Sequence, residues 1–322
     1  MKRHTLLFAI AASLATAHAA PAPAQTYPAR PIRVLVPYAP GGAVDFVART
    51  IGQKLGEAWS QSVLVDNRAG GATNIGSELA AKAASDGYTL LMGTAANAVN
   101  VSLYPKLAYD VRRDFVPVVL VGTSANVLVV HPSLPVQSAK ALIALAKAKP
   151  GELTYASAGT ASSNHLSGEL FQLMTGVKLV HVPYRGGGPA ITDLLGGQVT
   201  MYFSSLPSAL PLVKTGKLRA LGVTSAKRSA AAPDLPTIAE TVAGYTLVAW
   251  HAVLAPAGTP QDIVQRLNTE INRIVHVPET RARLEAQGVE VVGGTSGEFG
   301  RFLNDEIAKY AKLVKSASLT AD

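Results

Sequence analysis

Short hydrophobic runs alternate with amphipathic segments along most of the chain. Residues 32–36 form a β-branched run that ends at Pro37, and residues 45–55 then place apolar side chains at helical spacing. The same alternation continues to residue 224. Further strands are predicted at residues 62–65, 88–92, 153–157, 179–183, 199–204 and 218–224, and further helices at residues 75–84, 139–149, 165–174, 189–195 and 207–214. Repeated strand–helix–strand units with short connections predict an α/β fold with a mostly parallel sheet covered by helices.

A crossover between two lobes is predicted near the middle of the chain. Residues 115–130 contain two β-rich runs separated by residues 122–126, and the alternation then starts again. The last third predicts one strand, at residues 247–255, and two or three helices, at residues 260–275, 279–287 and 296–315. We expect lobe 1 to comprise residues 25–121 and 226–322, with either lobe able to carry the C-terminal helices, and lobe 2 to comprise residues 122–225. Hinges are then expected near residues 122–126 and 221–225.

An internal repeat favours two lobes of similar construction. Residues 36–42 read VPYAPGG and residues 182–188 read VPYRGGG. Both segments end a predicted strand, pass through glycines and lead into a predicted helix. Ligands of open α/β sheets bind at the carboxyl ends of strands. The repeat therefore predicts two glycine-rich loops that face one cleft.

The N-terminus has the layout of a secretory signal peptide. A short positive stretch, residues 1–4, precedes an apolar run of residues 5–17 and then small residues and prolines. Two A-x-A cleavage sites compete, at residues 17–19 and 22–24, and the second avoids a proline directly after the cut. We therefore expect a leader of residues 1–24, cleavage near Ala24 and a periplasmic mature protein.

Composition and charge remove several function classes. The 322 residues include 29 Lys+Arg and 21 Asp+Glu, a formal net charge of +8, and the basic residues are dispersed. Dispersed charge and only 6% aromatic residues argue against nucleic-acid binding and fit a surface that attracts anions. Cysteine is absent, which excludes disulfides, thiolate metal sites and cysteine nucleophiles. We expect no cofactor.

The glycine-rich loop before the first long helix is the first candidate binding element. Glycines at Gly41-Gly42 would let the backbone approach a ligand, and the first amides of a helix favour an anion such as a carboxylate. A plain strand-to-helix turn is the alternative. Asp45 is expected to act as an N-terminal cap rather than in catalysis.

The polar segment of residues 155–165 is the second candidate. Its hydroxyls could hold a polar ligand, or they could cap the next helix through Ser163 or Asn164. A serine hydrolase that uses Ser162 or Ser163 with His165 is an alternative, but no G-x-S-x-G motif is present.

Among charged residues, Arg185 is the best candidate for a bidentate pair with a ligand carboxylate, the alternative being a solvated loop arginine. The histidines show no metal-binding spacing, and we expect no metal site. His181, His251 and Trp250 are interpreted first as packed residues of strands.

These segments, in this order, resemble the Bug proteins, which are the extracytoplasmic solute receptors of tripartite tricarboxylate transporters. The resemblance covers essentially the whole mature chain and is carried by residues 27–32, 36–45, 65–76, 85–90, 153–171, 182–186, 194–199 and 254–260. It implies a type II periplasmic-binding (Venus-flytrap) fold, in which two β-α-β lobes are joined by crossover strands, and no catalysis.

The resemblance also implies a site and partners. A small carboxylated solute would lie between the lobes, and membrane transporter subunits would receive it from a monomeric receptor. The implied ligand-binding residues are Tyr38, Ala39, Gly41, Gly42, Asp45, Gly93, Thr94, Ala95, Asn97, Ser157, Ala158, Gly159, Ser162, Asn164, His165, Tyr184, Arg185, Gly186, Phe203, Ser204 and Ser205. A ligand sensor for a signalling partner would have the same fold. The sequence does not identify the solute.

Overall fold

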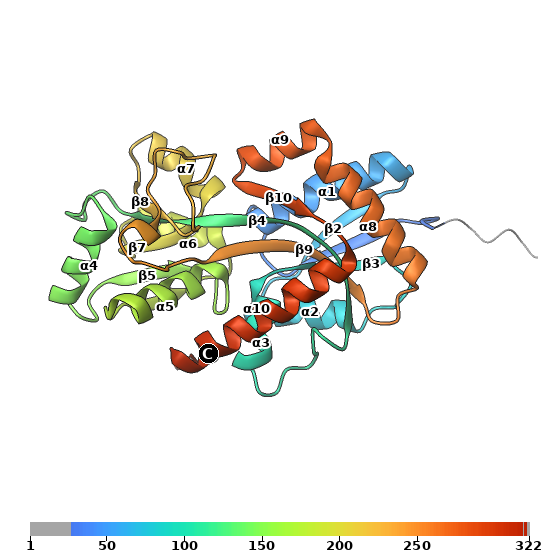
Figure 1. Ribbon diagram of the computed structural model, residues 1–322, viewed down its shortest axis with the longest axis horizontal. Helices are drawn as coiled ribbons and strands as arrows, with labels where there is room; N and C mark the ends of the chain where they lie inside the picture. Colours follow the sequence, from blue (N-terminus) through green and yellow to red (C-terminus); the bar gives the residue numbers. More distant parts are fainter. Residues whose placement is uncertain (1–26, 318, 321–322) are drawn as a thin grey trace, which may run out of the picture.

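Two groups of parallel strands, joined by long antiparallel strands, form the framework of the molecule (Figure 1). The computed structural model describes residues 27–317 and 319–320, so the predicted leader lies outside the described residues. Strands follow the order β2-β1-β3-β9-β4-β7-β5-β6, and β10 and β8 also pair with β4. The strands are β1 (Ile32–Val36), β2 (Val63–Asn67), β3 (Thr89–Gly93), β4 (Phe115–Val130), β5 (Thr154–Ser157), β6 (Val180–Pro183), β7 (Met201–Ser205), β8 (Arg219–Val223), β9 (Val248–Pro256) and β10 (Val289–Gly293).

Helices follow most of the strands directly. They are α1 (Ala43–Trp59), α2 (Asn74–Ala81), α3 (Ala95–Leu103), α4 (Ala139–Ala148), α5 (Ser163–Thr175), α6 (Gly187–Leu195), α7 (Leu206–Lys214), α8 (Gln261–His276), α9 (Pro278–Ala286) and α10 (Ser296–Ser316), with short 3-10 turns at Gly71–Thr73 and Ile238–Glu240. In the described part of the chain, no helix is both long and apolar enough to cross a lipid bilayer.

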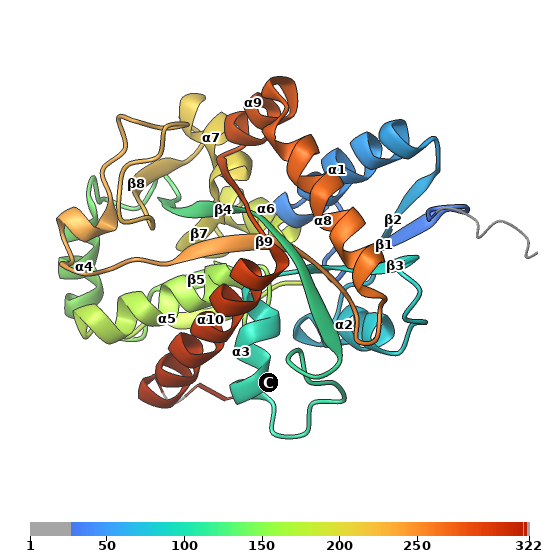
Figure 2. The ribbon, with the colours of Figure 1, turned by 45° about the vertical axis from the view of Figure 1, so that its right-hand side comes forward.

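In lobe 1, helices cover both faces of the sheet. Alternate residues of a strand point to opposite faces, so Val34 packs with α1 and α8 while Leu35 packs with α3 and α10. Figure 2 shows α8 and α1 on one side of these strands and α3 with α10 on the other. The apolar run of β1 is therefore explained by burial on both faces.

Lobe 2 repeats the same construction. Leu128 and Val130 of β4 pack with α4 and α5, whereas Val127 and Val129 pack with α6 and α7. Strands β5, β6 and β7 are parallel to one another, as the alternation predicts. The predicted α/β fold of two β-α-β lobes is confirmed.

The crossover differs from its prediction in one respect. Residues 115–130 form one continuous strand, because residues 122–125 pair with β9 and Asn126 pairs with Ser205 of β7. Strands β4 and β9 run side by side from one lobe into the other (Figure 1). Two elements that the pattern did not predict, α3 and β10, also belong to lobe 1.

The packing also bears on where the lobes divide. Ile238, Val242 and Tyr245 are buried against Phe171 and Phe203 in the core of lobe 2. We therefore propose that lobe 2 extends beyond the expected residue 225 to the start of β9, and that β4 and β9 are the two connections.

Candidate functional site

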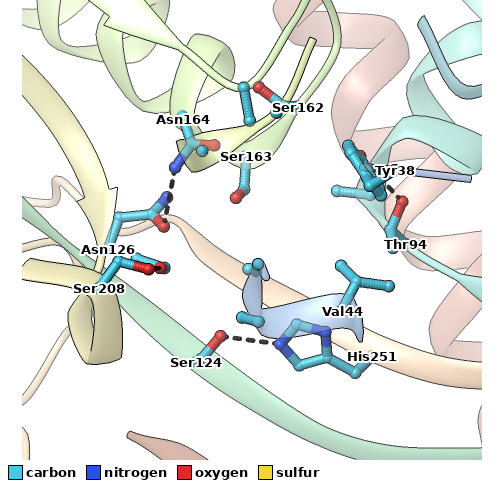
Figure 3. A pocket seen from close by; sticks show the side chains of 18 of the residues that line it. Tyr38, Val44, Thr94, Ser124, Asn126, Ser162, Ser163, Asn164, Ser208 and His251 are labelled. Carbon is cyan, nitrogen blue, oxygen red and sulfur yellow. Dashed lines mark hydrogen bonds between the residues drawn. The ribbon is translucent and has the colours of Figure 1, made fainter. Parts of the chain in front are cut away.

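Five helices begin at one chamber between the lobes. Figure 3 shows the side chains that line this chamber. Each helix starts directly after a parallel strand, so the first turns of α1 and α3 in lobe 1 meet those of α5, α6 and α7 in lobe 2. The chamber, together with the open solvent at its mouth, has a volume of about 670 Å³. The lining residues are Tyr38, Ala39, Gly42, Ala43, Val44, Thr94, Ala95, Ser124, Asn126, Ala158, Ser162, Ser163, Asn164, Gly186, Gly187, Tyr202, Ser205, Ser208, Ala249, Trp250 and His251.

The electrostatics of the chamber come from backbone and neutral side chains. The first amides of a helix lack partners within the helix and carry the positive end of its dipole. None of the described lining residues is Lys, Arg, Asp or Glu. The chamber can therefore hold an anion without a cationic side chain.

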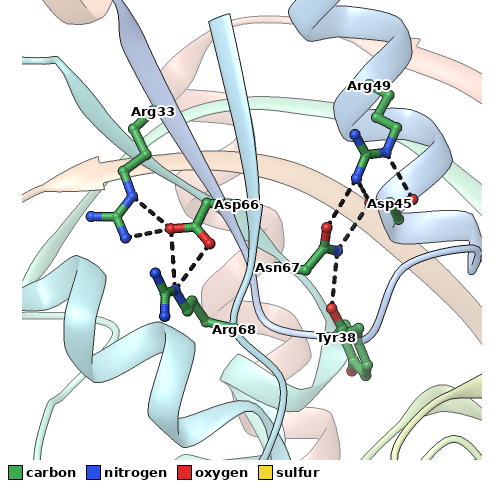
Figure 4. Close-up of polar contacts among 7 residues, drawn as sticks. All are labelled: Arg33, Tyr38, Asp45, Arg49, Asp66, Asn67 and Arg68. Carbon is green, nitrogen blue, oxygen red and sulfur yellow. Dashed lines mark hydrogen bonds and ion pairs between the residues drawn. The ribbon is translucent and has the colours of Figure 1, made fainter.

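In lobe 1, an Asp45-centred network fixes the loop that leads into α1 (Figure 4). One Asp45 oxygen accepts from the Gly41 amide at 3.1 Å and from Arg49 Nε at 3.0 Å, and the other accepts from Asn67 Nδ2 at 3.0 Å. The same Asn67 amide donates to the Tyr38 carbonyl at 3.0 Å. Burial raises the pKa of Asp45, but the hydrogen bonds from Arg49, Gly41 and Asn67 outweigh it and hold that pKa below its ordinary value.

The prediction that Asp45 caps the first long helix is wrong. Gly42, not Asp45, is the N-terminal cap of α1, because the helix begins at Ala43. Gly41 has a φ of 90°, which favours glycine, whereas Gly42 has a φ of −89° that any residue adopts. Only the first of the two glycines is required by backbone conformation.

The second wall of lobe 1 is the start of α3. The Asn97 side chain accepts from the Thr94 amide at 2.9 Å and donates to Ser77 at 2.8 Å, which fixes the first turn. Thr94 Oγ1 lies 3.3 Å from the Tyr38 hydroxyl. Burial raises the pKa of Tyr38 to about 12, so this hydroxyl stays neutral.

In lobe 2, Asn164 connects α5 to the crossover strand. Its Nδ2 donates to the Phe203 carbonyl at 2.5 Å and to Asn126 Oδ1 at 3.3 Å. Ser162 caps α5, accepting from the His165 amide at 3.3 Å, and so takes the role expected of Ser163 or Asn164. Ser163 and Asn164 instead line the chamber.

A stack of aromatic rings lies behind this wall. His165 and His181 stack with centroids 4.1 Å apart, and Ser157 Oγ lies 2.6 Å from His181 Nε2. Burial, and then the neighbouring His181, lower the pKa of His165 to about 3. His165 Nδ1 accepts from the Ala161 amide at 3.2 Å. The ring nitrogens of His165 thus face Ala161 and Glu169, and the geometry does not support a catalytic pair of His165 with Ser162 or Ser163.

Two central strands form the floor of the chamber. Ser124 of β4 and His251 of β9 are both buried, and Ser124 Oγ lies 3.0 Å from His251 Nε2 (Figure 3). Burial lowers the pKa of His251 to about 4. Next to it, Trp250 Nε1 donates to Glu306 at 3.0 Å.

Arg185 lies outside the chamber. It is exposed and lines an adjoining pocket with Gly159, Tyr184 and the turn at residues 70–73. The loops of the two lobes come together between these cavities, because a Cβ atom on Gly186 would lie 3.3 Å from Ala39 Cβ.

The structure divides the implied ligand-binding residues into three groups. Those that line the chamber are Tyr38, Ala39, Gly42, Thr94, Ala95, Ala158, Ser162, Asn164, Gly186 and Ser205. Those that line the adjoining pocket without lining the chamber are Gly159, Tyr184 and Arg185. Those that line neither are Gly41, Asp45, Gly93, Asn97, Ser157, His165, Phe203 and Ser204.

Sequence reasoning missed about half of the lining. The missed residues are Ala43, Val44, Ser124, Asn126, Ser163, Gly187, Tyr202, Ser208, Ala249, Trp250 and His251. Ala43, Ser163 and Gly187 lie in first turns after strands, a rule that could have found them. The floor residues lie inside apolar strands, where nothing in the pattern separates a cavity wall from a core. Over the described ranges, no cluster of His, Asp or Glu side chains is arranged to hold a metal ion.

The fold and the chamber define a two-lobed solute-binding protein. A solved structure described as R. palustris Rpa4515 with adipate is 39% identical, covers 91% of this chain and 99% of its own, and superposes with a TM-score of 0.88. The structure of MatC from Rhodopseudomonas palustris with bound malate is 30% identical to this chain. It covers 89% of this chain and 100% of its own, and it superposes with a TM-score of 0.84.

Sequence comparison identifies the family to which the chain belongs. The model of the tripartite tricarboxylate transporter family receptor matches residues 47–319. Protein BugT of Bordetella pertussis is 43% identical over 321 residues, which is 98% of each chain. This chain belongs to the tripartite tricarboxylate transporter receptor family, and the predicted resemblance to Bug proteins is confirmed.

Proposed function

We propose that the protein captures a small organic carboxylate between its lobes in the periplasm and delivers it to a tripartite tricarboxylate-type transporter. The observation that carries the proposal is the convergence of five helix N-termini on a chamber whose described lining has no charged side chain. Such a site compensates negative charge with backbone amides, which suits a carboxylate. Adipate and malate in the related structures support this ligand class.

The proposed ligand contacts come from both lobes. Gly42 and Thr94 mark the first turns of lobe 1, and Ser162, Gly186 and Ser205 mark those of lobe 2. Asp45, Asn97 and His165 would not contact the ligand themselves. They accept hydrogen bonds from backbone amides of these loops and so hold the first turns in place. Binding then brings the lobes together about β4 and β9, and no bond in the solute is made or broken.

Thermal-shift screening tests the ligand class. Because a ligand that binds only the folded state stabilises it by mass action, a carboxylate should raise the Tm in a concentration-dependent way. Each acid is paired with its primary amide as a control that keeps the shape and removes the charge. The proposal requires shifts with acids and none with the amides; equal shifts, or shifts with neither, would contradict it.

Delivery and location need a second experiment. Affinity capture from membranes, performed with and without the carboxylate found in the screen, should recover transporter membrane subunits. Recovery of a sensor kinase instead would favour the alternative role as a ligand sensor. Fractionation of cells should place the mature monomer, cleaved near Ala24, in the periplasm.

A further inference from the structure

His251 carries an unsatisfied polar atom in the floor of the chamber. The residue is only 1% exposed, and its Nε2 lies 3.0 Å from Ser124 Oγ. Its other ring nitrogen, Nδ1, has no hydrogen-bond partner. Among the buried side-chain atoms of the described residues that lack a partner, this one belongs to the chamber lining.

An unsatisfied buried nitrogen is unfavourable, so its position in a cavity wall is informative. Leaving such a group without a partner destabilises the folded protein, because the hydrogen bond that it made with water in the unfolded chain is lost. A ligand that supplied the missing partner would recover that free energy on binding. Ser124 can donate to or accept from Nε2, so Nδ1 can correspondingly donate to or accept from the ligand.

The surroundings of His251 disfavour a charged partner. Val44, Ala249 and Trp250 line the same chamber as His251 and supply apolar surface to it. Figure 3 labels Val44 and His251 among the lining side chains. The Trp250 indole N–H is already bonded to Glu306. Burial holds the ring neutral, since it lowers the pKa of His251 to about 4. An ionised group here would be desolvated with one neutral nitrogen as compensation, which is unfavourable, whereas a hydroxyl or carbonyl needs only one hydrogen bond.

We propose that His251 determines specificity, and that the solute is a carboxylate whose second polar group is uncharged: a hydroxyl, carbonyl or amide that pairs with Nδ1. This inference rests on the proposed function, because the first carboxylate is assigned to the helix N-termini. A site for a dicarboxylate would need a cation or further backbone amides at the floor to compensate the second negative charge. The floor of this chamber instead offers the neutral His251 ring.

Matched sets of acids test the proposal on the unmodified protein. Each set keeps one carboxylate and one carbon skeleton and changes only the distal group: hexanoate, its ω-hydroxy derivative and adipate; butanoate, its ω-hydroxy derivative and succinate; benzoate, meta-hydroxybenzoate and isophthalate. By calorimetry, the hydroxy acid should bind about 3–10-fold tighter than both other members of the best-binding set, as one added hydrogen bond implies. A dicarboxylate that binds tightest, or a methyl-ended or unsubstituted acid that binds as tightly as the hydroxy acid, overturns the inference.

Two substitutions of His251 separate its two nitrogens. His251→Asn places a polar group near the position of Nδ1 and loses the contact with Ser124, whereas His251→Gln reaches toward Ser124 and loses Nδ1. His251→Asn should keep the hydroxyl preference and His251→Gln should reduce it to within about 2-fold, while both bind the unsubstituted acid alike. A preference that survives in His251→Gln and is lost in His251→Asn overturns the assignment of Nδ1.

The outcomes distinguish this inference from the proposed function. Binding of carboxylates without a hydroxyl preference overturns the inference alone. No binding of any carboxylate in the three sets overturns both. Should either variant fail to fold by circular dichroism, the ranking of the sets on the parent protein still decides the question.

Discussion

The two copies of the Val-Pro-Tyr loop have similar sequences but enter their helices at different points. In lobe 1, α1 begins after both glycines, at Ala43, so that Gly42 faces the chamber. In lobe 2, α6 begins at the second of three glycines, Gly187, so the equivalent of Gly42 is Gly188, which is exposed and already helical. One more glycine thus changes which residue of the repeat faces the ligand site.

The two loops are also held differently. The lobe 1 loop is fixed by a buried carboxylate, Asp45, whereas in lobe 2 the Tyr184 hydroxyl donates to Asp193 at 2.7 Å near the surface. The Asp45 hydrogen bonds tie the lobe 1 loop to α1 and β2, and each loop also contains one glycine at positive φ, Gly41 at 90° and Gly186 at 143°. Sequence repetition therefore predicts a shared location but not a shared function at each position.

The largest effect is expected at the glycine that faces the chamber. A Cβ atom on Gly42 would meet no atom within 4 Å, so Gly42→Val should fold normally and place its methyl groups in the ligand space. We expect at least a ~100-fold loss of affinity, because overlap with the ligand cannot be relieved in a closely packed site. Calorimetry with the best carboxylate from the screen measures it.

A matched pair of alanines controls for the loop itself. Gly42→Ala and Gly188→Ala add the same methyl group at equivalent positions of the repeat, and Gly188 also has open space around its Cβ position. Gly42→Ala should weaken binding and Gly188→Ala should leave it unchanged. Equal effects at both positions, or parent-like binding by Gly42→Val, would remove the chamber as the ligand site.

The second-largest effect is expected where the two loops meet. Gly186 adopts a φ of 143° and a ψ of 172°, a region that is essentially restricted to glycine, so Gly186→Ala should lower the free energy of unfolding by about 1–3 kcal/mol. The added Cβ would also lie 3.3 Å from Ala39 Cβ and hinder closure. Urea unfolding measures the first effect, and the change in radius of gyration on ligand binding measures the second.

A double variant separates backbone strain from the contact between loops. Ala39→Gly removes the atom that the new Cβ would touch, so Ala39→Gly with Gly186→Ala should restore ligand-induced compaction and leave the loss of stability. If the single variant Gly186→Ala compacts as the parent does, the loops do not meet in the closed state.

A smaller effect is expected from the Asp45 network. Asp45→Asn should lower the free energy of unfolding by about 1–2 kcal/mol at neutral pH, less than a fully buried ion pair because Arg49 is half exposed. The folded pKa of Asp45 is lowered, so its contribution is complete above the ordinary value of about 3.9 and is lost as the pH falls through the folded pKa. The difference between variant and parent should therefore shrink below about pH 4.

Asp193 of lobe 2 provides a control for the effect of Asp45 on stability. Asp193→Asn keeps an oxygen that can accept from Tyr184, and it should cost less than Asp45→Asn at neutral pH. Urea unfolding at several pH values gives both differences. A constant penalty for Asp45→Asn down to pH values well below 4 would show that the charge of Asp45 does not stabilise the loop.

The same comparison shows how far the sequence predicts the site. Hydrophobic periodicity located β1 at its observed bounds and most helices to within a few residues, because burial on one or both faces leaves a direct pattern. It did not reveal α3, whose nine residues carry small side chains and two asparagines, or the face on which Ser124 and His251 lie. Those positions depend on how two distant strands pair, and residue types along one strand do not encode that.

The smallest effect is expected at Arg185, where the two copies differ most in charge. The equivalent position in lobe 1 is Ala39, which lines the chamber, but Arg185 is exposed and lines only the adjoining pocket. A solvated cation near the cleft attracts anions without holding them, so Arg185→Ala should change the Kd by no more than about 2-fold and should act on the association rate at low salt. Stopped-flow kinetics at two salt concentrations measures the association rate. Lys178→Ala is the control, since Lys178 is an exposed cation just before the opposite end of β6.

A loss of affinity of more than about 10-fold through faster dissociation would instead mean that Arg185 pairs with a buried ligand charge. The ligand would then extend from the chamber into the adjoining pocket, and both loops would contact the bound anion. Arg185 would in that case do more than attract the anion to the cleft.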